Sequence, residues 1–319
     1  MRSSPIAKTV RLTDVAKLVA RDPRATLVAD MQSGAYEGKT VENVDLSGAD
    51  LKGAPLARTT WQHANLSGAS LARADLRGAK IAQSELYEVD FTGALLEGAD
   101  LTGARVKTKQ LAGAELRGAR FRMADLTGVD VAGARIAGAS FEQSLLSGLS
   151  GEGLDLGGCD LTRASLDGAK LKGANLTRAR APQVRLDGAD LSNAKMAALH
   201  APLASARKAS LEGASLAGAM LERASFDGAN LRKADLRGAK LRKASFVGAD
   251  LRKADLTGAD LSYADLSHAK LELANLDDAD LSGANLHRTG TEGASMRGTK
   301  AKNARKTDPD RAKAEDFGE

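Results

Sequence analysis

The pattern of hydrophobic and polar positions repeats in blocks of five residues along most of the chain. Between residues 209 and 288 every block opens with Ala and carries Leu or Phe third, as in ASLEG, ASLAG, AMLER, ASFDG and ANLRK. The other three positions vary, and most are polar or Gly. From Val44 onward the central position falls on residue numbers ending in 1 or 6, so no insertion shifts the pattern.

A period of five fits neither an α-helix nor a continuous strand. At about 100° per residue, a helix would scatter the central Leu residues around its axis. A strand alternates its side chains, so an odd period would send successive Leu residues to opposite sides. Within one block, however, Ala and Leu lie two apart and share a face. If the chain turns after each block, four blocks close a square coil of about 20 residues, and coils stack at about 4.8 Å.

The blocks resemble the A(D/N)LXX motif of the pentapeptide-repeat family, for example in ADLRG, ADLRK, ADLTG and ANLDD. The resemblance implies an all-β solenoid, a right-handed quadrilateral β-helix, in a bacterial protein. The handedness comes from the resemblance alone, whereas the number of blocks predicts about 13 coils. We expect this β-helix to occupy residues 41–303.

The fifth residue of a block is often Gly, as at Gly48, Gly53 and Gly68. A corner that requires a positive φ accepts Gly without steric strain. We expect corners that end in Arg, Lys or Gln to use another turn, so that two turn types are mixed along the rod.

The two ends lack the repeat. Residues 1–40 read as a short helical N-terminal cap, with one helix after Thr13 and another after Asp22 and Pro23. Such a cap would cover the apolar cross-section of the first coil. Residues 304–319 form either a charged C-terminal tail or a short capping helix that starts near Asp308, with Phe317 as its bulky apolar residue.

Some blocks depart from the pattern. Lys109 occupies an inward Ala position, and Gly151 replaces a central Leu in a Gly-rich stretch. Ala181, Ala201 and Ala206 also stand at central positions. Because a missing Leu removes about 1.5–3 kcal/mol of burial energy, we predict bulged or looped corners near residues 107–110, 147–158 and 179–207.

Charge and composition limit the choice of cellular compartment. The 319-residue chain has 46 Lys and Arg against 41 Asp and Glu, a net charge of +5, and only 3% aromatic residues. A single cysteine, Cys159, excludes an internal disulfide framework. The N-terminus has no secretory apolar run, and no stretch approaches the length of a membrane span. We therefore expect a cytoplasmic protein.

Catalytic motifs are missing from the sequence. The four histidines, His63, His200, His268 and His287, have no metal-ligand spacing, and their positions in the blocks predict that all face outward. Cys159 stands at an inward Ala position, where a small buried thiol fits. An interior filled by Leu and Ala leaves no cleft for catalysis. We expect no enzyme, no cofactor and no metal.

The most informative surface feature is a cluster of basic residues, followed by a run of acidic ones. It is either an ordinary solvated surface or a docking patch for an acidic protein. Nucleic acid is a less favoured partner, because the chain lacks aromatic platforms for bases. The oligomeric state is left open. The candidate partner-binding residues are Arg232, Lys233, Arg237, Lys240, Arg242, Lys243, Arg252 and Lys253.

Two non-enzymatic functions compete. The first is a rigid protein-binding scaffold or adaptor. The segment LVADMQSGAYEGKTVENVDLSGADL resembles the lead-in to pentapeptide repeats of bacterial secretion proteins, including type VI components. The alternative, implied by the family's quinolone-resistance members, is a mimic of duplex DNA that inhibits or protects a type II topoisomerase, DNA gyrase. Such a mimic requires a continuous acidic stripe, which a chain of net charge +5 does not suggest.

Overall fold

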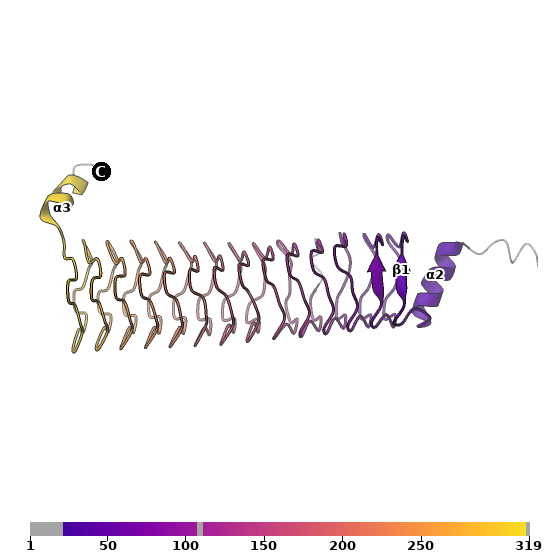
Figure 1. The fold of residues 1–319 in the computed structure, drawn as a ribbon, viewed down its shortest axis with the longest axis horizontal. Coiled ribbons are helices and arrows are strands. Elements are labelled where there is room, and N and C mark those ends of the chain that lie inside the picture. The colour runs from indigo at the N-terminus through magenta and orange to yellow at the C-terminus, as the bar shows by residue number, and fades with distance from the viewer. Residues whose placement is uncertain (1–21, 107–110, 317–319) are drawn as a thin grey trace, which may run out of the picture.

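The computed structural model describes residues 22–106 and 111–316, which form a long stack of coils with one helix at each end (Figure 1). Helix α2, Pro23–Gln32, lies across the N-terminal end of the stack, and helix α3, Pro309–Asp316, extends from the side of the last coils. Neither these helices nor any other described segment has the length and apolarity to cross a membrane as a helix.

Each coil pairs in parallel with the next at a spacing of 20 residues. Strands β1, Thr40–Glu42, and β2, Thr60–Gln62, pair with Thr40 opposite Thr60. Single parallel bridges continue this ladder from Asp45–Asn65 to Asn285–Arg305. Four five-residue blocks therefore complete one turn of a quadrilateral β-helix, as the period predicts.

The four corners of each coil align into four edges along the rod. We name each edge after its fifth-position residue in one coil: the 233, 238, 243 and 248 edges. Each edge includes the positions 20 residues before and after. Because the corners follow one another in this order around the square, the 233 and 243 edges are diagonally opposite.

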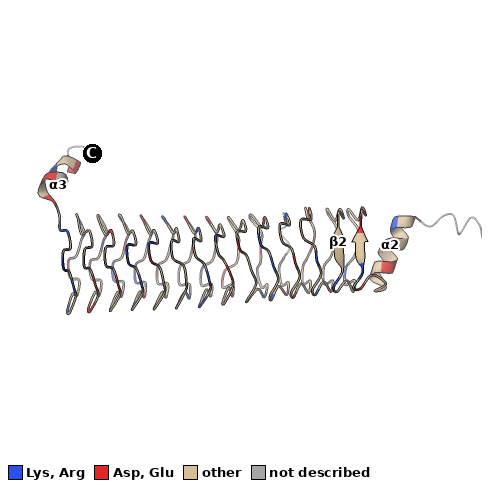
Figure 2. Cartoon of the chain, in the orientation of Figure 1, with Lys and Arg blue, Asp and Glu red and all other residues tan. Residues whose placement is uncertain are grey.

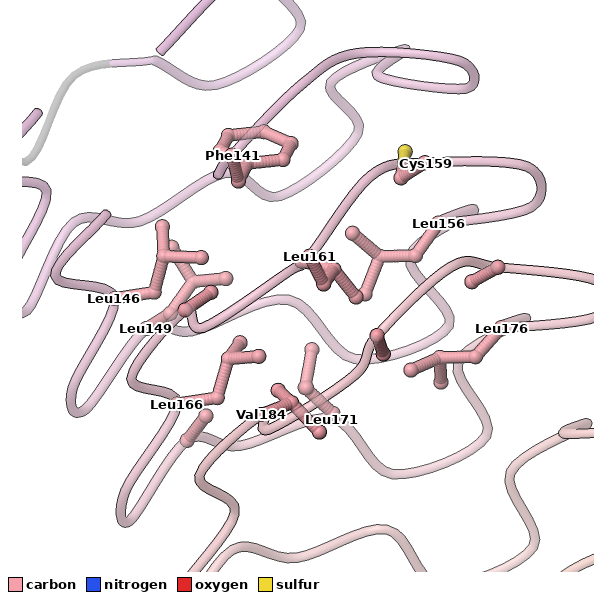
Figure 3. Packing of buried hydrophobic residues seen from close by; sticks show 14 of the residues in the cluster. Phe141, Leu146, Leu149, Leu156, Cys159, Leu161, Leu166, Leu171, Leu176 and Val184 are labelled. Carbon is pink, nitrogen blue, oxygen red and sulfur yellow. The ribbon is translucent and has the colours of Figure 1, made fainter. Parts of the chain in front are cut away.

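The central and Ala positions fill the axis of the coil. Leu211, Leu231 and Leu251 each have 0% exposure, and the side chains around Cys159 point into the same interior (Figure 3). Aromatic residues stack between successive coils, with ring centroids 5.2 Å apart for Phe121 and Phe141. The core is thus one continuous column of apolar side chains.

The Asp or Asn before each central residue stabilises the corner. Its side-chain oxygen accepts the backbone N–H two residues later, as between Asp45 and Ser47 at 2.9 Å and between Asp265 and Ser267 at 2.9 Å. This local bond is an Asx turn, which Asp and Asn form readily. It explains why the second position of a block favours these residues.

The prediction of two turn types is wrong. Every fifth-position residue that the structure describes has a positive φ, between +51° at Arg288 and +72° at Gly138. Most corners close with a backbone bond such as Ala49 N–H to Leu46 O, 3.0 Å, and most fifth residues donate to the next coil, as from Lys243 to Ser262 O at 2.9 Å. The ladder imposes one backbone shape, whatever side chain stands there.

The predicted bulges at 147–158 and 179–207 are also wrong. The ladder runs through 179–207, where Ala181 N–H bonds to His200 O at 2.7 Å. In 147–158 the corners keep the common turn and Gly151 N–H bonds to Lys170 O at 3.0 Å, but no bridge joins Asp155 to Arg135 of the preceding coil. A larger neighbour fills the missing volume, because a Cβ on Gly151 would lie 2.9 Å from Leu154 Cδ2. The third predicted irregularity, at 107–110 with Lys109, falls outside the described residues.

Helix α2 closes the first coil. Asp22 is its N-cap and accepts the backbone N–H of Arg24 at 2.9 Å, as the sequence indicates. Met31 has 0% exposure and packs against the core, while Gln32 donates from Nε2 to Asp50 O at 2.9 Å. The helix expected after Thr13 lies outside the described residues.

Candidate functional site

The structure separates the eight basic candidate residues: seven lie on three different edges, and one lies on a side between edges. Arg232 and Lys233 lie at the 233 edge, one coil before Arg252 and Lys253, as their spacing predicts, and Lys233 N–H bonds to Arg252 O at 3.0 Å. Arg237 lies at the 238 edge. Arg242 and Lys243 lie at the 243 edge, and Lys240 is on the side that leads to it. One flat partner surface cannot touch the 233 and 243 edges together.

Acidic neighbours pair with most cations of the 233 edge. The Arg252 guanidinium donates to both oxygens of Asp250, through Nε at 2.8 Å and Nη2 at 2.5 Å, and Arg232 lies 4.0 Å from the same carboxylate. Lys233 Nζ is 3.8 Å from Glu212. The hydrogen bond from Arg252 lowers the pKa of Asp250. These are solvated ion pairs of the kind that most charged surfaces carry.

Arg237 at the 238 edge is paired in the same way. Its guanidinium donates to both oxygens of Asp235, each at 2.8 Å, and lies 3.8 Å from Asp255. The hydrogen bond from Arg237 lowers the pKa of Asp235. In these two ADLR blocks, as in the ADLR block at 74–77, the Asp thus holds the turn and the Arg at once.

The cations at the 243 edge differ. Lys240, Arg242 and Lys243 form no ion pair with any residue in 22–106 or 111–316. The Arg242 guanidinium instead lies 5.3 Å from the centroid of the Tyr263 ring, a cation–π contact, and Tyr263 is 57% exposed. Figure 2 shows basic and acidic residues interspersed along the whole rod.

Helix α3 covers one of the histidines. His287 has only 2% exposure, so the prediction that all four histidines face outward is wrong at this residue. Glu315 of α3 lies 3.1 Å from His287 Nε2, 3.5 Å from His268 Nε2 and 3.2 Å from Arg288 Nε. Of the two predicted forms of this end, the described residues include the helix. Phe317 is outside them.

The ligand atoms of His268, His287 and Glu315 lie within 4.8 Å of one another, close enough for a metal site. Two contacts argue against a metal site here. His287 Nδ1 accepts the backbone N–H of Asp308 at 3.2 Å, so the ring proton is on Nε2, the atom facing Glu315. Arg288 shares the same carboxylate. The cluster is therefore a set of hydrogen bonds and ion pairs that attaches α3 to the rod.

A signal for this cluster was present in the sequence. His268 and His287 are separated by one residue less than a coil, which places them at adjacent corner positions of successive coils. Glu315 carried no such signal, because it lies outside the periodic part of the chain. The docking of α3 is a contact that periodicity does not encode.

Cys159 occupies the interior, as predicted. It has 0% exposure, and its thiol lies 3.2 Å from the carbonyl oxygen of Ile136. Burial raises its pKa to about 11, which keeps the thiol protonated near neutral pH. Figure 3 shows it among the apolar side chains of the core, so its role is packing.

A surface hollow of about 660 Å³ lies beside Trp61 and is bordered by Lys80, Glu85 and Asp100. The sequence predicts a rod without a cleft, so this hollow is not expected from the sequence. Its acidic groups are already paired, Glu85 with Arg105 at 2.9 Å and Asp100 with a neighbouring Arg at 3.0 Å. The Trp61 indole is 3% exposed and donates to Thr59. The hollow therefore offers no stacking surface or unpaired carboxylate for chemistry.

A model of pentapeptide repeats matches most of the chain, over residues 45–83, 84–105, 110–148 and 159–197, and over overlapping segments from 204 to 305. The chain belongs to the pentapeptide-repeat family. The stretches that the model leaves unmatched, 106–109, 149–158 and 198–203, are those where Gly, Ala or Lys interrupts the pattern. The family assignment thus rests on the regular blocks.

Solved structures of the same family are similar to this chain. A pentapeptide repeat protein from the Arabidopsis thaliana thylakoid lumen is 42% identical over 27% of this chain and 61% of its own length, with a TM-score of 0.27. HetL of Nostoc sp. strain PCC 7120 is 25% identical over 87% and 94%, TM-score 0.23. QnrB1, a plasmid-mediated fluoroquinolone resistance protein, is 20% identical over 69% and 97%, TM-score 0.36. No curated protein matches the chain.

Proposed function

We propose that this protein is a rigid scaffold or adaptor that binds another protein in the cytoplasm and catalyses no reaction. The backbone ladder supports this function, because it holds outward side chains at fixed intervals of about 4.8 Å along a rod of about 13 coils. Such a rod presents a surface that does not need to be ordered when a partner binds, which lowers the entropic penalty of association.

The observation that carries the proposal is the contrast between the two basic edges. Cations at the 233 edge are paired with Asp250 and Glu212, whereas Lys240, Arg242 and Lys243 have no ion pair among the described residues. Unpaired cations attract an acidic protein and raise its association rate. The acidic partner is therefore expected mainly at the 243 edge.

Affinity purification of two variants of the full chain tests this proposal. In the first variant Lys240, Arg242 and Lys243 are changed to Ser. In the second, Arg232, Lys233, Arg252 and Lys253 are changed to Ser. We expect the first variant to lose an acidic partner that the wild type retains, and the second to keep most of it, with both melting near the wild-type temperature. Equal retention by the first variant would contradict the proposal.

The N-terminal lead-in adds a proposed link to type VI secretion. The residues before the repeats carry that resemblance, so it is independent of the basic edges. Identification of the captured protein by mass spectrometry decides this point: a component of a secretion system supports the link, and an unrelated cytoplasmic protein removes it.

Mimicry of duplex DNA is the alternative function. It requires a dense acidic stripe, but charges alternate along the ladders of this rod, for example through Lys80, Asp100 and Arg120. The net charge of +5 also argues against a mimic of duplex DNA. We expect purified protein at equimolar amounts to leave DNA supercoiling by gyrase unchanged. Inhibition of gyrase, or its protection from a quinolone, would replace the scaffold proposal with this one.

A further inference from the structure

The four edges of the rod differ in their glycine content. At the 248 edge Gly recurs at 128, 148, 168, 188, 228 and 248, and the 233 and 238 edges are similarly rich in Gly. Along the 243 edge, by contrast, eight successive coils carry a side chain at this corner and none carries Gly. These residues are Met123, Gln143, Arg163, Gln183, Leu203, Arg223, Lys243 and Tyr263.

The turn itself does not explain this difference. Met123, Leu203 and Tyr263 have φ values of +57°, +60° and +61°, close to those of the glycines at the other edges. Residues with a side chain are strained in this left-handed region, whereas Gly adopts it freely. Local folding therefore favours Gly equally at all four edges. The side chains along the 243 edge oppose that preference, which points to a role outside the fold.

The eight residues have the composition of a binding surface. None of the eight carries a carboxylate, although Glu142 and Glu222 stand beside two of them, and three large apolar side chains are exposed: Met123 at 59%, Leu203 at 47% and Tyr263 at 57%. Three others are cations, of which Arg163 donates to Gln183 at 2.8 Å. Met, Tyr and Arg are the residues that protein interfaces favour over other surfaces. At about 4.8 Å per coil, the row extends for about 34 Å.

We infer that the 243 edge between residues 123 and 263 is a docking ridge for a protein segment that combines carboxylates with apolar side chains. This inference rests on the proposed scaffold function and names its partner chemistry. Carboxylates complement Arg223, Arg242 and Lys243, which have no ion pair among the described residues. Apolar side chains of the partner cover Met123, Leu203 and Tyr263, which a phosphate backbone would leave uncovered.

Substitution by Gly separates binding from folding here, because Gly removes a side chain and relieves the strained φ. The ridge variant combines Leu203→Gly, Arg223→Gly, Lys243→Gly and Tyr263→Gly. The control variant combines four equivalent corner changes at the other edges, Lys208→Gly, Lys233→Gly, Lys253→Gly and Leu273→Gly. All eight positions have positive φ. The control removes more positive charge than the ridge variant, so loss of charge alone would affect it more.

Fluorescence anisotropy with three labelled probes measures the effect. The first probe is an extended peptide of about 12 residues with alternating Glu and Leu or Tyr, about as long as the row. The second has Ser in place of Leu and Tyr, and the third is a short DNA duplex. We expect the first probe to bind the wild-type protein most tightly, the ridge variant to weaken it about tenfold or more, and the control variant to change it less than about twofold.

Three results would overturn the ridge assignment: no binding of the first probe to the wild type, equal weakening in both variants, or tighter binding of the Ser peptide or the duplex. A fall in melting temperature of the ridge variant alone would also overturn it, because the side chains would then be structural. The affinity purification is independent of these probes. The ridge variant could keep a partner that is lost when Lys240, Arg242 and Lys243 are changed to Ser. That result would support the scaffold proposal and refute the ridge assignment.

Discussion

Two segments of the rod have different sequences but the same backbone. Residues 209–288 keep Leu or Phe at every central position, whereas 147–207 place Gly or Ala at several of them. Both form the same coil and turn, although the irregular segment lacks the bridge between Arg135 and Asp155 that a regular ladder carries. The difference teaches that each layer of the core requires a total apolar volume and does not require Leu at one particular position.

The irregular segment reaches that volume by exchange between neighbouring positions. Leu154 stands at an Ala position beside Gly151 and lies over it. Val184 likewise follows Ala181, and Leu199 precedes Ala201, all of them buried. The nearby core, lined by residues such as Phe121, Leu146 and Leu156, contains a small apolar cavity with room for no more than about one water molecule. Compensation within a layer therefore restores close packing.

The largest predicted effect is at the compensating residue. We expect Leu154→Ala to lower the free energy of unfolding by about 4 kcal/mol, because the adjacent Gly151 leaves nothing to fill the cavity. In the regular segment, Leu231→Ala should lower it by about 3 kcal/mol. Urea unfolding followed by circular dichroism measures both. A smaller loss at Leu154 than at Leu231 would refute the exchange of volume.

Mutation can reverse the exchange of apolar volume between Gly151 and Leu154. Gly151→Leu alone should destabilise the protein by about 1–3 kcal/mol, because the new side chain meets Leu154 and Val131. Added to Leu154→Ala, the same change should recover about 2 kcal/mol or more, since it restores the regular arrangement. A double-mutant cycle in urea measures this coupling. Additive effects would mean that the two residues do not share one space.

Acid should weaken the regular segment more than the irregular one. Arg237 and Arg252 lower the pKa values of Asp235 and Asp250, and 147–207 contains no such ADLR block. A carboxyl whose folded pKa is depressed stabilises the fold above its unfolded value of about 3.9, and this contribution is lost as pH falls through the folded pKa.

We therefore expect Asp235→Asn with Asp250→Asn to lower the melting temperature by about 2–4 °C at pH 7, a small value because water screens both pairs. The difference between the wild type and the variant should shrink as the pH falls below about 3.9. Calorimetry between pH 3 and pH 7 checks this, and a difference independent of pH would argue against the pairs. Asn keeps the Asx turn, so the comparison isolates the charge.

The smallest effect concerns the turn that both segments share. Ala198 and Lys253 have φ values of +53° and +61°. Ala198→Gly and Lys253→Gly should each raise stability by about 1 kcal/mol or less, since Gly relieves the strain. Thermal melting of the two variants measures it. Clearly unequal changes would show that the corners of the two segments are not equivalent.

The sequence alone determined the quadrilateral coil, the inward side chains, the N-cap at Asp22 and the burial of Cys159. Alternation of side chains and the bonding needs of the backbone are local, and a strict period repeats them. The separation of Lys233 from Lys243 follows from five residues per side, so counting blocks predicts it although charge clustering does not.

Only the tertiary structure decided which cations are paired, which glycine gap is filled and which histidine is covered. Asp250 holds Arg252, Leu154 fills the space beside Gly151, and α3 buries His287. The physical reason is the same in each case. These contacts depend on how individual side chains meet across a layer or across the end of the repeat, and a five-residue pattern specifies where a side chain points but not what it touches.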